Sequence, residues 1–255
     1  MDLKSLIYYK LVFPLAIKLD KIMGLDFLSD IHAEEVGLDP KLVHNSSPSS
    51  KRFLKRVLND FTISPLDSII DIGCGKGYAL RTMLKFHFEK VDGIELSSHI
   101  ANIATQNFKR LNSKRTKIFT GDATQFNEYD AYNFIYLFNP FPSVVMSEVI
   151  HRLIQSIRRS DREVVIIYLA PVCNEVIVSN GLFTKTGIYH RKGSWITIYS
   201  NRSFNESKLS TNKKMCPIAE NSALSDELED YLEKHQFSQK EYCHSLIQKK
   251  PILNE

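Results

Sequence analysis

From Ser68 to Leu169 short apolar runs alternate with segments of helix length, and this alternation limits the fold more than any other feature of the sequence. The runs, which are rich in Ile, Val and Phe, are typical of strands buried on both faces; they read "SIIDI", "KVDGIEL", "YNFIYLF" and "EVVIIYL". Parallel neighbouring strands cannot be joined by a tight turn, so helices between them indicate crossover connections. The expected core is therefore α/β with an open, mostly parallel sheet.

The pattern changes on both sides of this core. After Pro171 two β-rich runs flank "HRKGS" and predict an antiparallel hairpin at one edge of the sheet. Residues 1–62 have helical periodicity with an interruption at Pro14, which predicts an N-terminal helical extension. Residues 204–255 are rich in Ser, Asn, Lys and Glu, and we expect a loosely attached polar tail. The central domain is then residues 63–203.

Composition and charge argue against several classes of protein. The four cysteines stand far apart without metal-ligand spacing, so neither a zinc site nor any other metal site is expected. A formal charge of +4 with short basic clusters does not favour a nucleic-acid partner. The apolar runs near the start are too short to span a membrane, and no secretory signal is visible. We expect a cytoplasmic protein, and the sequence does not indicate its oligomeric state.

Three glycines follow the first apolar run in "DIGCGKG", at Gly73, Gly75 and Gly77. A glycine-rich turn between a strand and a helix lets a ligand approach the backbone closely. A dinucleotide-binding fingerprint needs its third glycine one position later, where this chain has Tyr78. A nicotinamide-dependent reductase is therefore disfavoured.

With Asp71 at the strand end, the segment resembles the first motif of class I S-adenosylmethionine-dependent methyltransferases. The resemblance implies a Rossmann-like sheet of seven strands with helices on both faces, and S-adenosyl-L-methionine as cofactor. It also implies that Glu95, 18 residues after Gly77, binds the ribose hydroxyls, with Leu96 beside it. At the end of the third strand it implies contacts to the adenine from a further pair, Asp122 and Ala123. Asp92, within a strand pattern, is interpreted as solvent-facing or as an edge feature.

The fourth strand ends in "YLFNPFP", at the sheet edge where open α/β folds place reactive ligands. This resembles the (Asp/Asn)-Pro-Pro-aromatic motif of amino-methylating enzymes, in which the polar side chain holds a planar nitrogen. Phe141 replaces the second proline. Asn139 and Phe141 are the candidate catalytic residues, with Asn139 also near the cofactor. The alternative is a strand-terminating turn with Phe141 packed under the cofactor.

Residues 19–200 are similar to a bacterial group of class I methyltransferases with an Asn-Pro-Phe motif at this place. The same outline is similar to that of non-SET protein-lysine methyltransferases, and both groups carry a Tyr-x-Pro segment ahead of the glycine loop. This chain departs from both at Ser46, which replaces that tyrosine, at Tyr78, which replaces an arginine, and at Ala170, which replaces an asparagine. These changes bear on the acceptor more than on the cofactor.

The predicted function is methyl transfer from S-adenosylmethionine to an unidentified acceptor, an amine or a small-molecule or saccharide group. No histidine stands in a motif where it would act as general base, which favours nitrogen over oxygen as acceptor; the histidines considered are His44, His99, His151 and His190. Two alternatives remain open. One is a protein-lysine methyltransferase, and the other is a regulatory protein that binds the cofactor without turnover.

Overall fold

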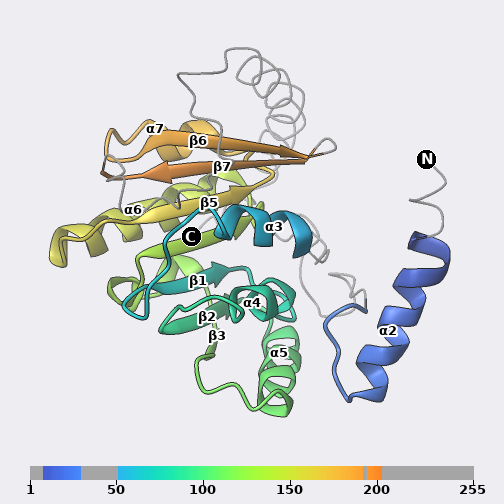
Figure 1. Cartoon of the computed structure of the whole chain (residues 1–255). Coiled ribbons are helices and arrows are strands. Elements are labelled where there is room, and N and C mark those ends of the chain that lie inside the picture. Colours follow the sequence, from blue (N-terminus) through green and yellow to red (C-terminus); the bar gives the residue numbers. More distant parts are fainter. Residues whose placement is uncertain (1–7, 30–50, 192–193, 203–255) are drawn as a thin grey trace, which may run out of the picture.

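Seven strands form one sheet in the computed structural model of the chain, in the order β3-β2-β1-β4-β5-β7-β6 (Figure 1). The structure describes residues 8–29, 51–191 and 194–202. Strands β1 to β5 pair in parallel, whereas β7 is antiparallel to both β5 and β6. The expected mostly parallel sheet with a C-terminal hairpin is confirmed. The strands are β1 (Ser68–Ile72), β2 (Lys90–Glu95), β3 (Ile118–Thr120), β4 (Phe134–Phe138), β5 (Val165–Leu169), β6 (Thr184–Arg191) and β7 (Ser194–Ser200).

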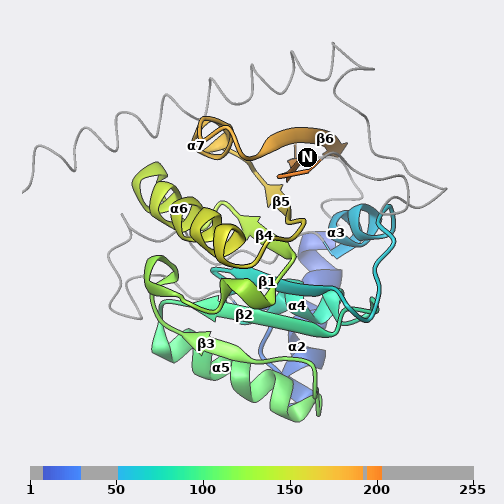
Figure 2. The same ribbon diagram turned by 90° about the vertical axis from the view of Figure 1, so that its left-hand side faces the viewer.

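Helices cover both faces of the sheet, as Figure 2 shows with α6 in front of the strands and α2 and α4 behind them. One apolar core contains side chains of α3, α4 and α5, and the other contains side chains of α6 and α7. The strands between them are Ile-rich and Val-rich because both of their faces are buried. The helices are α2 (Phe13–Ile22), α3 (Lys51–Leu58), α4 (Tyr78–Met83), α5 (Ser98–Arg110), α6 (Ser143–Arg159) and α7 (Asn174–Val178), with short helical turns η1 (Tyr8–Val12), η3 (Ala123–Gln125) and η4 (Tyr129–Ala131).

Where the structure describes the start of the chain, Tyr8–Val12 and Phe13–Ile22 are helical, as the periodicity predicts. The interruption expected at Pro14 falls where the π-helical turn η1 meets α2, and Pro14 stands in the first turn of α2. Helix α3 buries four apolar side chains in the same core as α4 and the sheet; these are Phe53, Leu54, Val57 and Leu58. Ser46 and the polar tail lie outside the described residues, so the division into three regions stays a prediction.

The interpretation of Asp92 as solvent-facing or as an edge feature is wrong. Its carboxylate is buried in β2 between β1 and β3. It accepts hydrogen bonds from the Lys117 amide at 2.6 Å and from the Tyr132 hydroxyl at 2.7 Å. Burial raises the pKa of this carboxyl, although both hydrogen bonds oppose the rise. Asp92 therefore has a structural role, because it joins β2 to the start of β3 and to the segment after η4.

The order of the sheet reverses between β1 and β4, since β2 and β3 lie on one side of β1 and β5 lies beyond β4. At such a reversal the connections leave on opposite faces and open a crevice at the carboxyl ends of the strands. The glycine-rich turn and the Asn-Pro-Phe segment both follow strands at this point. Among the described residues no helix has the length and apolarity needed to cross a membrane.

Candidate cofactor site and active site

The glycine-rich segment turns the chain from the end of β1 into the start of α4. Gly73, Gly75 and Gly77 have φ angles of +77°, +54° and +86°, in the left-handed region that glycine adopts without steric penalty. The amides of Gly73 and Cys74 both donate to the carbonyl oxygen of Ile94, at 2.9 and 3.1 Å. The predicted tight turn is confirmed, and hydrogen bonds fasten it to the end of β2.

Two of these glycines lie where a side chain would collide with its surroundings. A Cβ atom on Gly73 would stand 2.7 Å from the Cβ atom of Pro140, and one on Gly77 would stand 2.4 Å from Cε2 of Phe108 in α5. Real Cβ contacts are essentially never this short. The turn is therefore held between the Asn-Pro-Phe segment and α5, and the predicted cofactor loop touches the predicted acceptor motif.

Two acidic side chains are buried at the ends of β1 and β2. The carboxyl of Asp71 is 3% exposed. Burial raises the pKa of Asp71 from its ordinary 3.8 to about 8, and the charge of Glu95 adds to the rise. A desolvated acid of this kind gains from a cationic group placed beside it. Asp71 therefore fits the ammonium group of a ligand that occupies the glycine-rich turn.

Glu95, at the end of β2, holds the glycine-rich turn in place. Its carboxylate accepts hydrogen bonds from the amides of Gly75 and Ser97, each at 3.0 Å. Burial raises the pKa of Glu95, and these backbone donors oppose the rise. A carboxylate has about four lone-pair sites, so acceptor capacity remains for a hydroxyl group of a ligand. The neighbouring Leu96 is 49% exposed, which leaves an apolar surface open beside the carboxylate.

The pair predicted to contact the adenine, Asp122 and Ala123, follows β3. Asp122 is exposed, and its Oδ1 atom accepts a hydrogen bond from the Thr124 amide at 2.8 Å, which caps the turn η3. Ala123 is half-buried, and its carbonyl oxygen accepts a hydrogen bond from the Tyr129 hydroxyl at 3.0 Å. The second carboxylate oxygen of Asp122 takes no part in the cap and remains available to an amino group.

The Asn-Pro-Phe segment lies at the end of β4, on the other side of β1 from β2 and β3. Asn139 is half-buried and has a left-handed backbone with φ of +36°, which is uncommon for a residue other than glycine. Phe141 is 8% exposed and belongs to the apolar core beneath α6. The catalytic assignment of both residues stays a prediction. The burial of Phe141 favours a packing role, the alternative interpretation of this residue.

Tyr168 in β5 contacts Asn139, and no motif in the sequence singled it out. Its hydroxyl donates to Oδ1 of Asn139 at 3.3 Å and accepts from the amide of Cys173 at 3.4 Å. The side chain is fully buried, and burial raises its pKa. Residues Leu137 and Tyr168 are register partners in neighbouring strands, which explains why two segments distant in sequence meet here.

Comparison with known protein families gives a match over the part of the chain that contains these residues. Residues 69–162 match the family model described as "Methyltransferase domain". This part of the chain is a methyltransferase domain. It extends from β1 to just beyond α6 and includes the glycine-rich turn, both buried acids and Asn139. The resemblance to class I methyltransferases is confirmed by this match.

Relatives and solved structures that resemble the chain are more distant. The rRNA adenine N-6-methyltransferases of Escherichia coli and Clostridium perfringens are 26% and 27% identical to it over 143 and 144 residues. Each match covers 56% of this chain and 52% of the relative, so the chain spans about half the length of the curated relatives it matches. A putative methyltransferase of Escherichia coli superposes with a TM-score of 0.48 at 14% identity, covering 61% of this chain and 89% of that one. An RNA methyltransferase from Salinibacter ruber, in complex with S-adenosyl-L-homocysteine, has a TM-score of 0.45 at 14% identity, with 64% and 99% covered.

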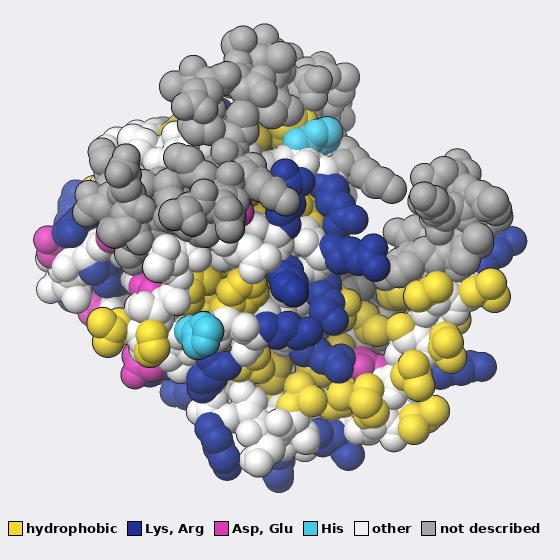
Figure 3. Space-filling view, viewed as in Figure 1, with side chains coloured by type: hydrophobic (Ala, Val, Ile, Leu, Met, Phe, Trp, Pro, Cys, Tyr) yellow, Lys and Arg dark blue, Asp and Glu magenta, His cyan; other side chains and the backbone are white. Residues whose placement is uncertain are grey.

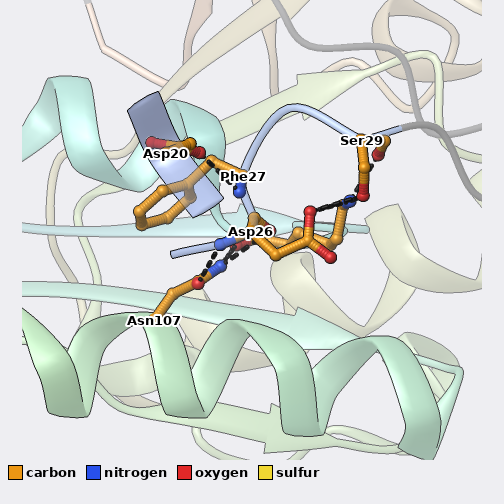
Figure 4. Close-up of polar contacts among 6 residues, drawn as sticks. Asp20, Asp26, Phe27, Ser29 and Asn107 are labelled. Atoms are coloured by element: carbon orange, nitrogen blue, oxygen red, sulfur yellow. Dashed lines mark hydrogen bonds and ion pairs between the residues drawn. The ribbon is translucent and has the colours of Figure 1, made fainter. Parts of the chain in front are cut away.

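The methyltransferase domain also holds part of the N-terminal segment against its glycine-rich turn. The Lys76 ammonium is buried and donates to Oδ1 of Asp26 at 2.8 Å and to Ser29. Asn107 in α5 bonds both the amide and the carbonyl of Asp26, at 2.8 and 2.9 Å (Figure 4). Burial raises the pKa of Asp26, but the hydrogen bonds from Lys76 and Ser29 outweigh it, and the net shift is downward.

A second ion pair joins helix α2 to the methyltransferase domain. Arg81 in α4 contacts the buried carboxylate of Asp20 at 3.0 Å. The guanidinium also lies 5.0 Å from the ring centroid of Phe27, whose amide donates to Asp20 at 2.8 Å. Sequence reasoning missed this whole contact, because Asp20 and Arg81 stand 61 positions apart and belong to no motif.

Proposed function

We propose that the chain binds S-adenosyl-L-methionine at the glycine-rich turn and transfers its methyl group to a nitrogen acceptor. The observation that carries this proposal is the buried pair Asp71 and Glu95 beside a turn that touches the Asn-Pro-Phe segment. A cation with adjacent hydroxyl groups satisfies both acids. A dinucleotide has ribose hydroxyls that would satisfy Glu95 as well, but it would place negatively charged phosphates at the turn and leave Asp71 without a cation.

Each residue predicted to bind the cofactor has a place in this proposal. Asp71 receives the ammonium group, Glu95 receives the ribose hydroxyls, and Leu96, Asp122 and Ala123 surround the adenine. When bound, the cofactor supplies a methyl group on a positively charged sulfur. The glycine-rich turn lets the backbone approach it, because Gly73, Gly75 and Gly77 carry no side chain.

Asn139 orients the acceptor in this proposal. Its Oδ1 atom already accepts one hydrogen bond from Tyr168 and has a second lone pair for an acceptor N–H group. Orientation and proximity are worth up to about 7–11 kcal/mol of an activation barrier in the best cases. A neutral amine loses its proton after transfer and needs no base in the transition state. Two of the described histidines have partners elsewhere, since His190 stacks on Trp195 with ring centroids 4.2 Å apart and His151 contacts Gln155.

A second candidate acceptor is an adenine amino group in RNA. The curated relatives named above are described as rRNA adenine N-6-methyltransferases, which runs against the expectation that nucleic acid is not a partner. Basic side chains also gather over α3 and α4 (Figure 3). Burial lowers the pKa of Lys51, and the nearby charges of Lys85, Arg81 and Lys55 lower it further. A phosphate backbone relieves such crowding.

Calorimetric titration with S-adenosylmethionine and with its demethylated product tests the cofactor. Transfer of a labelled methyl group is then measured to an RNA pool, a lysine-peptide pool and a mixture of amino sugars. Binding without transfer to any pool supports the alternative of a protein that binds the cofactor without turnover. Absence of binding to either compound overturns the proposal.

Two substitutions that remove the side-chain amide test Asn139, and they differ in the backbone strain that they leave. Asn139→Gly suits the left-handed φ of +36°, whereas Asn139→Ala adds strain. We expect both variants to bind the cofactor as the wild type does and to lose about 100-fold or more in turnover. Asn139→Asp keeps an acceptor oxygen, so it retains more activity than either. Equal turnover in wild type and Asn139→Gly would leave the motif as a structural turn.

A further inference from the structure

Helix α2 presents an apolar surface to solvent. Residues 11–23 contain six of the ten large apolar side chains that are exposed among the described residues. Leu11 is 67% and Ile22 is 80% exposed. The space-filling view shows these hydrophobic side chains gathered over α2 on the right-hand flank of the molecule (Figure 3). We call this surface the outer stripe; it consists of Leu11, Val12, Leu15, Leu19, Ile22 and Met23.

The opposite face of the same helix is already occupied. Phe13, Ala16 and Ile17 pack against the core that contains α3, α4 and α5. Asp20 is buried beside them and forms the ion pair with Arg81. The outer stripe is therefore not the face that the helix turns toward its own domain. A helix that is apolar on both faces normally has both faces covered.

The exposed charges on this segment are all positive. Lys10, Lys18 and Lys21 are exposed, whereas the acid Asp20 is buried and neutralised by Arg81. At 3.6 residues per turn, Lys18 and Lys21 lie along one flank of the outer stripe. A surface of this composition matches an anionic partner with an apolar interior.

The composition of the stripe separates the candidate partners. Protein interfaces are enriched in Tyr, Trp and Arg and are poor in Lys, with few energetic hot spots at Leu. A second copy of this helix would bring lysines near lysines. Interfacial helices that lie in membrane surfaces combine Leu-rich apolar faces with lysine flanks. We propose that the outer stripe of α2 docks on an anionic lipid surface, with the helix lying in the plane of the interface.

This docking would fix how the methyltransferase domain faces the lipid. The ion pair of Asp20 with Arg81 holds α2 against α4, and the contact of Asp26 with Lys76 holds the segment after α2 against the glycine-rich turn. The α2 side of the domain would then lie at the lipid surface. The inference does not depend on the proposed methyl transfer.

Co-sedimentation of the full chain with vesicles tests the proposal. Vesicles of phosphatidylcholine alone are compared with vesicles containing about one third phosphatidylglycerol. We expect binding to the anionic vesicles that is at least tenfold tighter than to the neutral ones and that weakens with added salt. Leu15→Ser with Leu19→Ser, and separately Lys18→Glu with Lys21→Glu, should each weaken binding at least tenfold. Leu66→Ser is the matched control, since Leu66 is exposed in a loop away from α2.

Three results would overturn the proposal. The first is equal or absent binding to both kinds of vesicle. The second is anionic binding that survives the Leu15 and Leu19 substitutions, since another surface would then hold the lipid. The third is a fall in melting temperature or in oligomeric state caused by those two substitutions but not by Leu66→Ser. That result would show that protein, either this chain or a second copy, covers the stripe.

Discussion

The carboxyl edge of the sheet has two halves, the loop after β1 and the loops after β4 and β5. Both halves contain residues with a left-handed backbone, but the types of residue differ. After β1 the left-handed positions are glycines, at Gly73, Gly75 and Gly77. After β4 and β5 they are Asn139 and Ala170, with φ angles of +36° and +53°. A left-handed residue with a Cβ atom costs roughly 1–2 kcal/mol relative to the right-handed conformation. The half after β1 is thus free of this backbone strain, and we call it the relaxed half. The half after β4 and β5 carries the strain, and we call it the strained half.

This difference follows from what each half has to provide. A loop that meets a ligand with its backbone gains from having no side chain. In the proposed function Asn139 supplies an amide group, which glycine lacks, and the strain is retained. Strained residues persist where the surroundings hold them in place, and the hydrogen bond from Tyr168 is one such restraint on Asn139.

The largest effect is expected from a branched side chain in the relaxed half. Gly73→Val adds a Cβ atom 2.7 Å from that of Pro140, at φ of +77°, and should weaken cofactor binding by more than 100-fold in calorimetry. Gly181→Val is the matched control, because Gly181 has φ of +73° but no atom within 4 Å of the added Cβ. The control should lose stability to urea and keep its cofactor affinity. Similar affinities for the two variants would show that the collision with Pro140 is not what matters.

A smaller effect is expected from the buried acid of the same half. Asp71→Asn keeps the size of the side chain and removes its charge, so it should weaken cofactor binding at least tenfold. The same change should stabilise the ligand-free protein, since burial raises the pKa of Asp71 to about 8 from an ordinary 3.8. Between these values the folded wild type holds a proton that the unfolded chain has released. Its free energy of unfolding therefore falls as the pH rises from about 4 to about 8.

The gain from Asp71→Asn is accordingly small near pH 4 and largest above pH 8. Thermal melts of both proteins across this range measure it. A gain that does not grow with pH would show that Asp71 is already ionised in the folded protein.

The sequence predicted the relaxed half better than the strained half. Glycines at fixed spacing behind an Ile-rich strand are a local signal, and the turn, the sheet and the hairpin were all predicted correctly. Contacts between distant side chains have no such signal. Tyr168 stands 29 positions from Asn139 and Lys76 stands 50 from Asp26. The wrong interpretation of Asp92 has the same cause, because its partner Tyr132 lies 40 positions away.

The third prediction concerns the restraint on Asn139. Tyr168→Phe removes the hydroxyl and leaves the packing, so the amide of Asn139 is free to rotate and its oxygen faces the acceptor for less of the time. Turnover should fall by about tenfold while cofactor affinity and acceptor KM stay near wild type. Tyr199→Phe is the control, since Tyr199 is equally buried in the same core but bonds Asn174 at 2.8 Å. Comparable losses in both variants would assign Tyr168 to stability alone.

The smallest effect is expected from relieving strain at Ala170, which neighbours Asn139 across the sheet. Phe138 and Leu169 are register partners, so the two left-handed residues follow adjacent strand ends. Ala170→Gly removes the Cβ penalty. Glycine also raises the conformational entropy of the unfolded chain, which lowers the stability by about 0.4–1 kcal/mol. The net gain should be about 0.5 kcal/mol in urea unfolding, with cofactor affinity unchanged. Asparagine tolerates the left-handed region, so Ala170→Asn should be at least as stable as wild type. A loss of stability in both variants would contradict strain at this position, and the contrast between the two halves would then rest on Asn139 alone.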